Sequence, residues 1–226
     1  MNKASKIVVV LVFIIVILFG VGQFFAFSNI NPSANQQVAP QTPGSTASPT
    51  QVVAFTASVP ASSTPTENGS CFANSIAAPY RSDAWRCTVG NAISDPCFQI
   101  SGSKNLLCGM NPAEGPYATS TFVLHLMKAL PPVFVPSATP ANWAWAIQLA
   151  DGTYCTPFTG TRPFTASGTV GYYACNSPNP YESMIFGDLN ASSSAWLAEV
   201  GSLAIHTSSL PTLQYSEIVP ISTAWQ

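Results

Sequence analysis

The stretch Trp143–Phe158, "WAWAIQLADGTYCTPF", has the pattern of a β-hairpin. Two short apolar runs flank Asp151-Gly152, a dipeptide that is typical of the tight turn between two antiparallel strands. Cys155 lies in the second run, and Cys175 ends the next one along the chain, "TVGYYAC". The stretch therefore indicates a β fold in which cysteines lie on neighbouring strands.

Similar short runs recur towards the C-terminus, and loops of Ser, Pro, Asn and Gly separate them. This spacing favours a mainly β domain, a small antiparallel sandwich or barrel with disulfide-stapled loops. Ala195–Val200 fits a short helix equally well, because so few apolar residues do not fix a period. We expect Cys71–Cys108 to be mostly loops, with one short helix or turn near Asp83–Arg86. The further expected strands are Ser120–Leu126, Thr169–Cys175, Ser183–Leu189, Ala195–Leu203 and Tyr215–Thr223.

The N-terminal run Ile7–Phe27 predicts one transmembrane helix ahead of this domain. As a helix it would extend about 32 Å, enough to cross a hydrocarbon core of about 30 Å. The alternative is a secretory signal peptide cleaved near Ala26 and Ser28, although its apolar core would be unusually long. Lys3 and Lys6 precede the run, so residues 1–6 should be cytoplasmic and everything after residue 27 extracytoplasmic.

Residues 28–70 are rich in Pro, Ser and Thr, and they are predicted to form a disordered stalk. Such a composition buries too little apolar surface to offset the entropy of ordering the chain. Gln51–Phe55 could form a short strand, but we expect it to be unstructured. Residues 71–226 are then the folded extracytoplasmic domain.

Six cysteines, an even number, all follow the predicted span. None belongs to a C-x-x-C motif, so a zinc site and a dithiol redox site are both disfavoured. In an oxidising compartment the cysteines should form three disulfides. Six cysteines allow fifteen pairings; pairing nearest neighbours gives Cys71–Cys87, Cys97–Cys108 and Cys155–Cys175.

The low charge excludes several classes of partner. Only 7% of residues are charged, against about 25% in a typical domain. The domain has no basic stripe for nucleic acid and no acidic cluster for calcium, and no motif indicates a cofactor. Apart from the membrane that holds the N-terminal helix, we expect an envelope protein or a glycan as the ligand, recognised through hydroxyl, amide and aromatic groups.

Candidate catalytic residues lack a framing motif. His206 could join a Ser–His–acid site, but no G-x-S-x-G turn surrounds any serine, and His125 reads as a strand histidine with local hydrogen bonds. Asp95 and Asp151 look like turn residues, and Arg86–Asp95 is the preferred ion pair, in a local set with Arg81 and Asp83. The carboxylates that could serve glycoside cleavage are Asp83, Asp95, Glu114, Asp151, Glu182 and Asp188.

Aromatic side chains give a third possibility, a sugar-binding platform. Trp143 and Trp145 should share one strand face, whereas Tyr172 and Tyr173 should lie on opposite faces. The alternative for each ring is the core, and Trp85, Trp145 and Trp196 are expected there. A glycan platform would then use a pair of the remaining rings.

The cysteine-rich region carries Asp-Ala-Trp-Arg-Cys at 83–87 and Asp-Pro-Cys-Phe at 95–98. Together with "GYYAC", "FGDL" and "VPISTAW" further along, these motifs resemble extracytoplasmic domains of bacterial proteins that follow an anchor and a Ser/Pro/Thr-rich stalk. The resemblance covers most of residues 71–226. It implies a bacterial, disulfide-bonded domain and carries over no catalytic residue.

The sequence thus predicts a membrane-anchored, extracytoplasmic binding or interaction module of the bacterial cell envelope, without enzymatic activity. One alternative is a cell-envelope hydrolase acting on a glycan or peptide polymer. Another is a structural subunit of a surface assembly. If the N-terminal segment is cleaved, the domain would be secreted.

Overall fold

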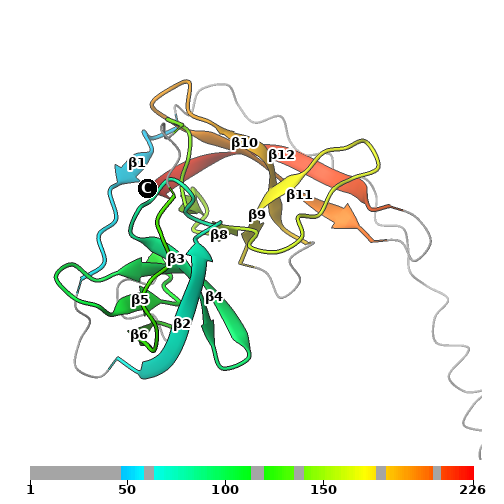
Figure 1. Ribbon diagram of the computed structural model, residues 1–226. Helices are drawn as coiled ribbons and strands as arrows, with labels where there is room; N and C mark the ends of the chain where they lie inside the picture. The colour runs from blue at the N-terminus through cyan, green and yellow to red at the C-terminus, as the bar shows by residue number, and fades with distance from the viewer. Residues whose placement is uncertain (1–46, 59–63, 113–119, 135–139, 177–181, 206–209) are drawn as a thin grey trace, which may run out of the picture. The chain divides into compact units, whose positions relative to one another are not determined.

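Two closed β-sheets make up the fold in the computed structural model, which describes residues 47–58, 64–112, 120–134, 140–176, 182–205 and 210–226 (Figure 1). The predicted mainly β class is confirmed. The strands within these residues are β1 (Gln51–Val53), β2 (Thr66–Asn74), β3 (Ala84–Val89), β4 (Ala92–Gln99), β5 (Leu106–Cys108), β6 (Phe122–Leu126), β7 (Ala146–Leu149), β8 (Tyr154–Pro157), β9 (Gly171–Cys175), β10 (Met184–Asn190), β11 (Leu197–Ala204) and β12 (Thr212–Trp225).

Strands β2 to β6 form a small barrel. Consecutive strands pair antiparallel, and a parallel pairing of β2 with β6 closes the ring. Because successive side chains on a strand point to opposite faces, Cys97 faces the barrel interior while Phe98 faces outwards. A barrel this small is filled by its own side chains. Its interior cluster is Cys71, Trp85, Cys87, Cys97, Leu106, Cys108 and Leu124.

The second sheet runs β1-β12-β11-β10-β9-β8-β7, and an additional β12–β7 pairing closes it. The predicted hairpin is confirmed as β7 and β8, which pair antiparallel. The backbone N–H of Thr153 donates to Asp151 Oδ1 at 2.8 Å, so Asp151 has the predicted turn role. Trp196 was predicted to lie in the core, and it is buried in the hydrophobic cluster that the strands of this sheet form.

All six cysteines are paired in three disulfides, and the nearest-neighbour pairing is the observed one. Each bond joins residues directly opposite one another on adjacent antiparallel strands, β2–β3, β4–β5 and β8–β9. The disulfides therefore fix strand register rather than loops. Within the described part of the chain, no cluster of His, Cys, Asp or Glu could hold a metal ion.

An aromatic cluster packs the barrel against the second sheet. Phe98 from β4 and Trp145, which precedes β7, have ring centroids 4.8 Å apart, and Phe55 packs 5.0 Å from Phe98. Arg81 donates from Nη1 to the backbone oxygens of Phe55 and Gln226, both at 2.8 Å. This contact holds together segments that are far apart in the sequence.

For Ala195–Val200, where strand and helix were both open, the structure has a strand: β11 pairs with β12 along its length and with β10 over residues 197–201. Two expectations are corrected by the structure. Cys71–Cys108 is not mostly loops, because its residues alternate between the barrel interior and the outside on β2 to β5. The stalk boundary at residue 70 is too late: β1 pairs with β12, β2 begins at Thr66, and residues 46–226 form one compact unit.

The predicted span at 7–27 lies outside the described residues. Among the residues that are described, no helix is long and apolar enough to cross a membrane.

Candidate functional site

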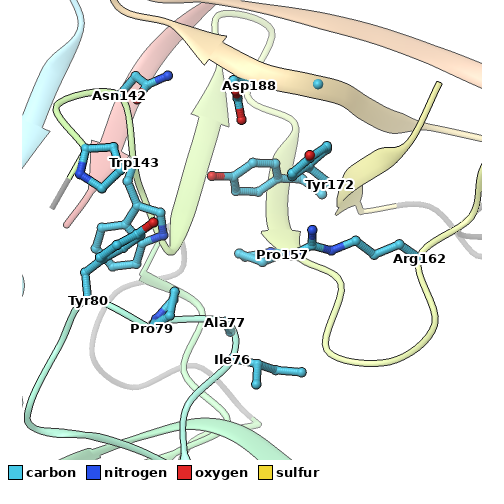
Figure 2. A pocket seen from close by; sticks show the side chains of 13 residues that line it. Ile76, Ala77, Pro79, Tyr80, Asn142, Trp143, Pro157, Arg162, Tyr172 and Asp188 are labelled. Carbon is cyan, nitrogen blue, oxygen red and sulfur yellow. The ribbon is translucent and has the colours of Figure 1, made fainter. Parts of the chain in front are cut away.

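A cavity of about 400 Å³ is lined by three parts of the fold. These are the β2–β3 loop, the segment that leads into β7, and the strands β9 and β10 with the loop between β8 and β9 (Figure 2). We call it the aromatic pocket. Its lining residues are Ile76, Ala77, Pro79, Tyr80, Pro140, Asn142, Trp143, Pro157, Arg162, Tyr172, Tyr173, Gly187 and Asp188.

The β2–β3 loop is held by the predicted ion pair. Arg86 Nη1 lies 3.2 Å from Asp95 Oδ2, and this carboxylate also accepts from the Ser75 hydroxyl and the Ile76 backbone N–H. The Asp95 side chain is 1% exposed. The sequence suggested a turn role for Asp95, and this interpretation was wrong. Asp95 is instead the buried hydrogen-bond acceptor that fixes one wall of the pocket.

Arg86 also reaches the opposite wall. Its Nη1 donates to the backbone oxygen of Thr159 at 2.7 Å, in the β8–β9 loop that carries Arg162. One guanidinium thus joins the barrel to the loop on the far side of the pocket. The expected set of ion pairs is completed by Arg81 with Asp83 at 2.6 Å.

The segment that leads into β7 is fixed by side-chain hydrogen bonds to its backbone. Gln226 Nε2 donates to Trp143 O at 2.7 Å, and the Tyr173 hydroxyl donates to Ala144 O at 2.8 Å. Asn142 Nδ2 donates to Leu189 O at 2.9 Å, which ties this segment to β10. These bonds fix the backbone that carries Trp143 before any ligand arrives, and such preorganisation reduces the entropic cost of binding.

Burial raises the pKa of the Tyr173 phenol, and the nearby Asp188 carboxylate raises this pKa further, whereas the hydrogen bond to Ala144 and the Arg162 charge lower it. The net shift is upwards, so Tyr173 remains a neutral hydrogen-bond donor at physiological pH.

Aromatic rings form two sides of the pocket. Tyr80 and Trp143 meet edge to face, with centroids 5.3 Å apart and planes at 70°. Across the cavity, the Arg162 guanidinium lies over the Tyr172 ring at 4.7 Å from its centroid. Figure 2 shows Tyr80 and Trp143 on one side and Tyr172 and Arg162 on the other. All three rings are only partly buried, so each keeps accessible surface for a ligand.

Asp188 points into the space between these two sides (Figure 2). The alternation of β10 is interrupted here, because its register with β9 and β11 shifts after Ile185 and Phe186. Gly187, with φ of 66°, adopts the left-handed conformation that glycine accepts most readily. A bulge of this kind redirects the following side chain, and the carboxylate at 188 is exposed in the pocket.

The sequence identified part of this site. Trp143, Tyr172 and Tyr173 line the pocket, whereas Trp145 and Trp85 lie in the core as expected. Tyr80, Asn142 and Arg162 were missed, because they approach the pocket from elements that only the fold brings together. The glycine inside the run "FGDL" was a signal for a bulge beside Asp188.

The remaining candidates do not meet at this site. His125 Nδ1 lies 2.9 Å from Asn105 Oδ1, the local hydrogen bond that was expected. Asp83 pairs with Arg81, Asp151 lies in the β7–β8 turn, and Glu182 is an exposed residue ahead of β10. His206 and Glu114 lie outside the described residues.

No protein-family model matches the chain, and neither do any curated proteins or solved structures.

Proposed function

We propose that this chain is a membrane-anchored, extracytoplasmic binding module of a bacterial cell envelope, and that its aromatic pocket binds a glycan. One observation carries the proposal: a pocket of about 400 Å³ combines three accessible aromatic rings with polar side chains. Pockets for small ligands are usually of this size and join apolar walls to a few placed polar groups.

A sugar ring fits this combination better than a purely apolar or a purely ionic ligand. One face of a sugar presents C–H groups that can lie against Tyr80, Trp143 or Tyr172, because the face of an aromatic ring is electron-rich. The rim of the sugar carries hydroxyls, which both donate and accept hydrogen bonds. The Asp188 carboxylate can accept from such hydroxyls, and the Arg162 guanidinium can donate to them.

The localisation rests on different grounds. An apolar run long enough to span a membrane, Ile7–Phe27, precedes the domain. The lysines before this run favour an N-terminus on the cytoplasmic side. Three disulfides and no free cysteine suit an oxidising compartment outside the cytoplasm.

The number of carboxylates in the described pocket lining favours binding of a glycan over its hydrolysis. Glycosidases use two carboxylates on either side of the scissile bond. Asp188 is the one acidic residue among the described residues that line the pocket, and Asp83 and Asp95 are engaged with arginines. The described lining of the pocket therefore has one carboxylate that can orient a sugar and no second one to cleave it.

A glycan array probed with the full-length chain in detergent tests the proposal. We expect binding to one group of glycans, and we expect Tyr172→Ala to weaken it at least about tenfold, since central aromatic contacts are common binding hot spots. Tyr215→Ala is the matched control, because Tyr215 is a half-exposed strand tyrosine outside the pocket. Binding that both variants reduce equally, or no binding to any glycan, would contradict the proposal.

A further inference from the structure

Arg162 is the only arginine without an acidic partner among the described residues. Arg81 pairs with Asp83 at 2.6 Å and Arg86 pairs with Asp95 at 3.2 Å. Among the described residues, the Arg162 guanidinium makes no ion pair or side-chain hydrogen bond; it lies over the Tyr172 ring, and its charge also acts on Tyr173. The pocket thus contains a cation whose hydrogen-bonding groups have no protein acceptor in the described part of the chain.

The position of the Arg162 guanidinium over the Tyr172 ring indicates which ligand groups it can bind. The guanidinium carbon lies 4.7 Å from the centroid of the Tyr172 ring, and no described residue accepts a hydrogen bond from the guanidinium N–H groups. A planar acceptor with two oxygens, such as a carboxylate, matches this fork with two parallel hydrogen bonds. A single hydroxyl can accept a hydrogen bond from only one of these two N–H groups.

The described lining of the pocket contains one cationic and one anionic side chain, Arg162 and Asp188. Asp188 makes no ion pair with Arg162, and Figure 2 shows the two side chains entering the cavity from different directions. A ligand carboxylate would be repelled near Asp188 and attracted near Arg162. Asp188 would in turn accept from hydroxyls at the other end of the ligand, so the two charges fix the direction in which it lies.

We propose that the aromatic pocket selects acidic sugars, such as hexuronates, by binding the sugar carboxylate at Arg162 while Asp188 accepts from the sugar hydroxyls. This inference rests on the glycan binding proposed above and specifies its ligand class. Because Arg162 is exposed, solvent and salt reduce the contribution of the charge, and a preference of about tenfold over a neutral sugar is expected at low salt.

The test compares three methyl glycosides that share one ring: glucoside, glucuronide and glucosaminide. Each is titrated into the full-length ¹⁵N-labelled chain in detergent, and affinities are read from chemical-shift changes, which detect millimolar binding. We expect the glucuronide to bind about tenfold more tightly than the glucoside, and the preference to shrink as NaCl is added.

Two variants assign the preference to one side chain. Arg162→Gln should weaken binding of the glucuronide more than binding of the glucoside and so remove the preference. Arg162→Lys should restore part of the preference, because lysine keeps the charge but not the fork. Lys104→Gln removes an exposed positive charge outside the pocket and should leave the preference unchanged.

The outcomes separate the two proposals. Equal binding of glucoside and glucuronide, or tightest binding of the glucosaminide, overturns the acidic-sugar inference and leaves glycan binding standing. A preference that survives Arg162→Gln overturns it as well. No shift with any of the three glycosides counts against both proposals.

Discussion

Replacing Asp95 with asparagine should destabilise the protein more than any other single loss of charge near the pocket. The side chain at 95 is 1% exposed and accepts from Ser75, Ile76 and Arg86. Asp95→Asn keeps the size but removes the charge, so the Arg86 guanidinium, 18% exposed, loses its counterion. Breaking a buried ion pair on one side costs about 3–5 kcal/mol.

The lower end of that range applies here, because Arg86 keeps its hydrogen bond to Thr159 O. We expect a loss of about 3 kcal/mol, which for a domain of this size lowers the melting temperature by about 6–12 °C. The measurement is urea unfolding followed by tryptophan fluorescence, with calorimetry for the melting temperature.

Asp83→Asn is the matched control. Asp83 also pairs with an arginine, but its side chain is 37% exposed, so its loss should cost about 1 kcal/mol or less. If the two variants lose the same stability, burial of the Asp95 pair is not what holds the β2–β3 loop, and the account of that pocket wall is wrong.

Three further outcomes follow from the fold. Replacing Cys155 and Cys175 together by alanine should cost about 3 kcal/mol, because their bond closes a short loop in the unfolded chain, and the urea midpoint should fall accordingly. Gly201→Ala should reduce the yield of folded protein, measured by gel filtration, since a Cβ there would lie 2.2 Å from the Tyr215 backbone oxygen on β12; normal folding would contradict that packing. Burial raises the pKa of the Tyr173 phenol, so the contribution of Tyr173 to the unfolding free energy should be constant below a pH of about 10 and should decrease above it. Tyr173→Phe should weaken this alkaline decline, and an identical pH profile in both proteins would show that Tyr173 is not the group responsible.

Local features of the fold could be predicted from the sequence. The β7–β8 hairpin follows from Asp151-Gly152 between two apolar runs, and Cys155–Cys175 joins strands that are neighbours along the chain. The Arg86–Asp95 pair was also predictable, because β3 and β4 are consecutive and pair with one another.

Long-range pairings could not be predicted. The parallel pairing of β2 with β6 sets Thr66 opposite Val123, and that of β1 with β12 sets Gln51 opposite Thr223. Nothing in the Ser/Pro/Thr-rich composition of residues 28–70 distinguishes the part that joins a sheet from a stalk. The expected boundary was therefore placed at the first cysteine.

The candidate site depends on those long-range contacts. Trp143 and Tyr172 stood out by residue type, but Tyr80 becomes their neighbour only when the barrel packs against the second sheet through Phe98 and Trp145. No sequence motif singles out Arg162. Its stacking on Tyr172 and its lack of an acidic partner in the described chain are properties of the folded state.

The most direct test of the central claim, that the aromatic pocket is the glycan site, is the indole ¹H–¹⁵N signal of Trp143 in the full-length chain. Titration with the oligosaccharide that binds best on the array should shift this signal saturably. The signals of Trp85 and Trp196, which are buried away from the pocket, should stay in place. Saturable binding that leaves the Trp143 signal unmoved would mean that the glycan binds elsewhere and would contradict the account.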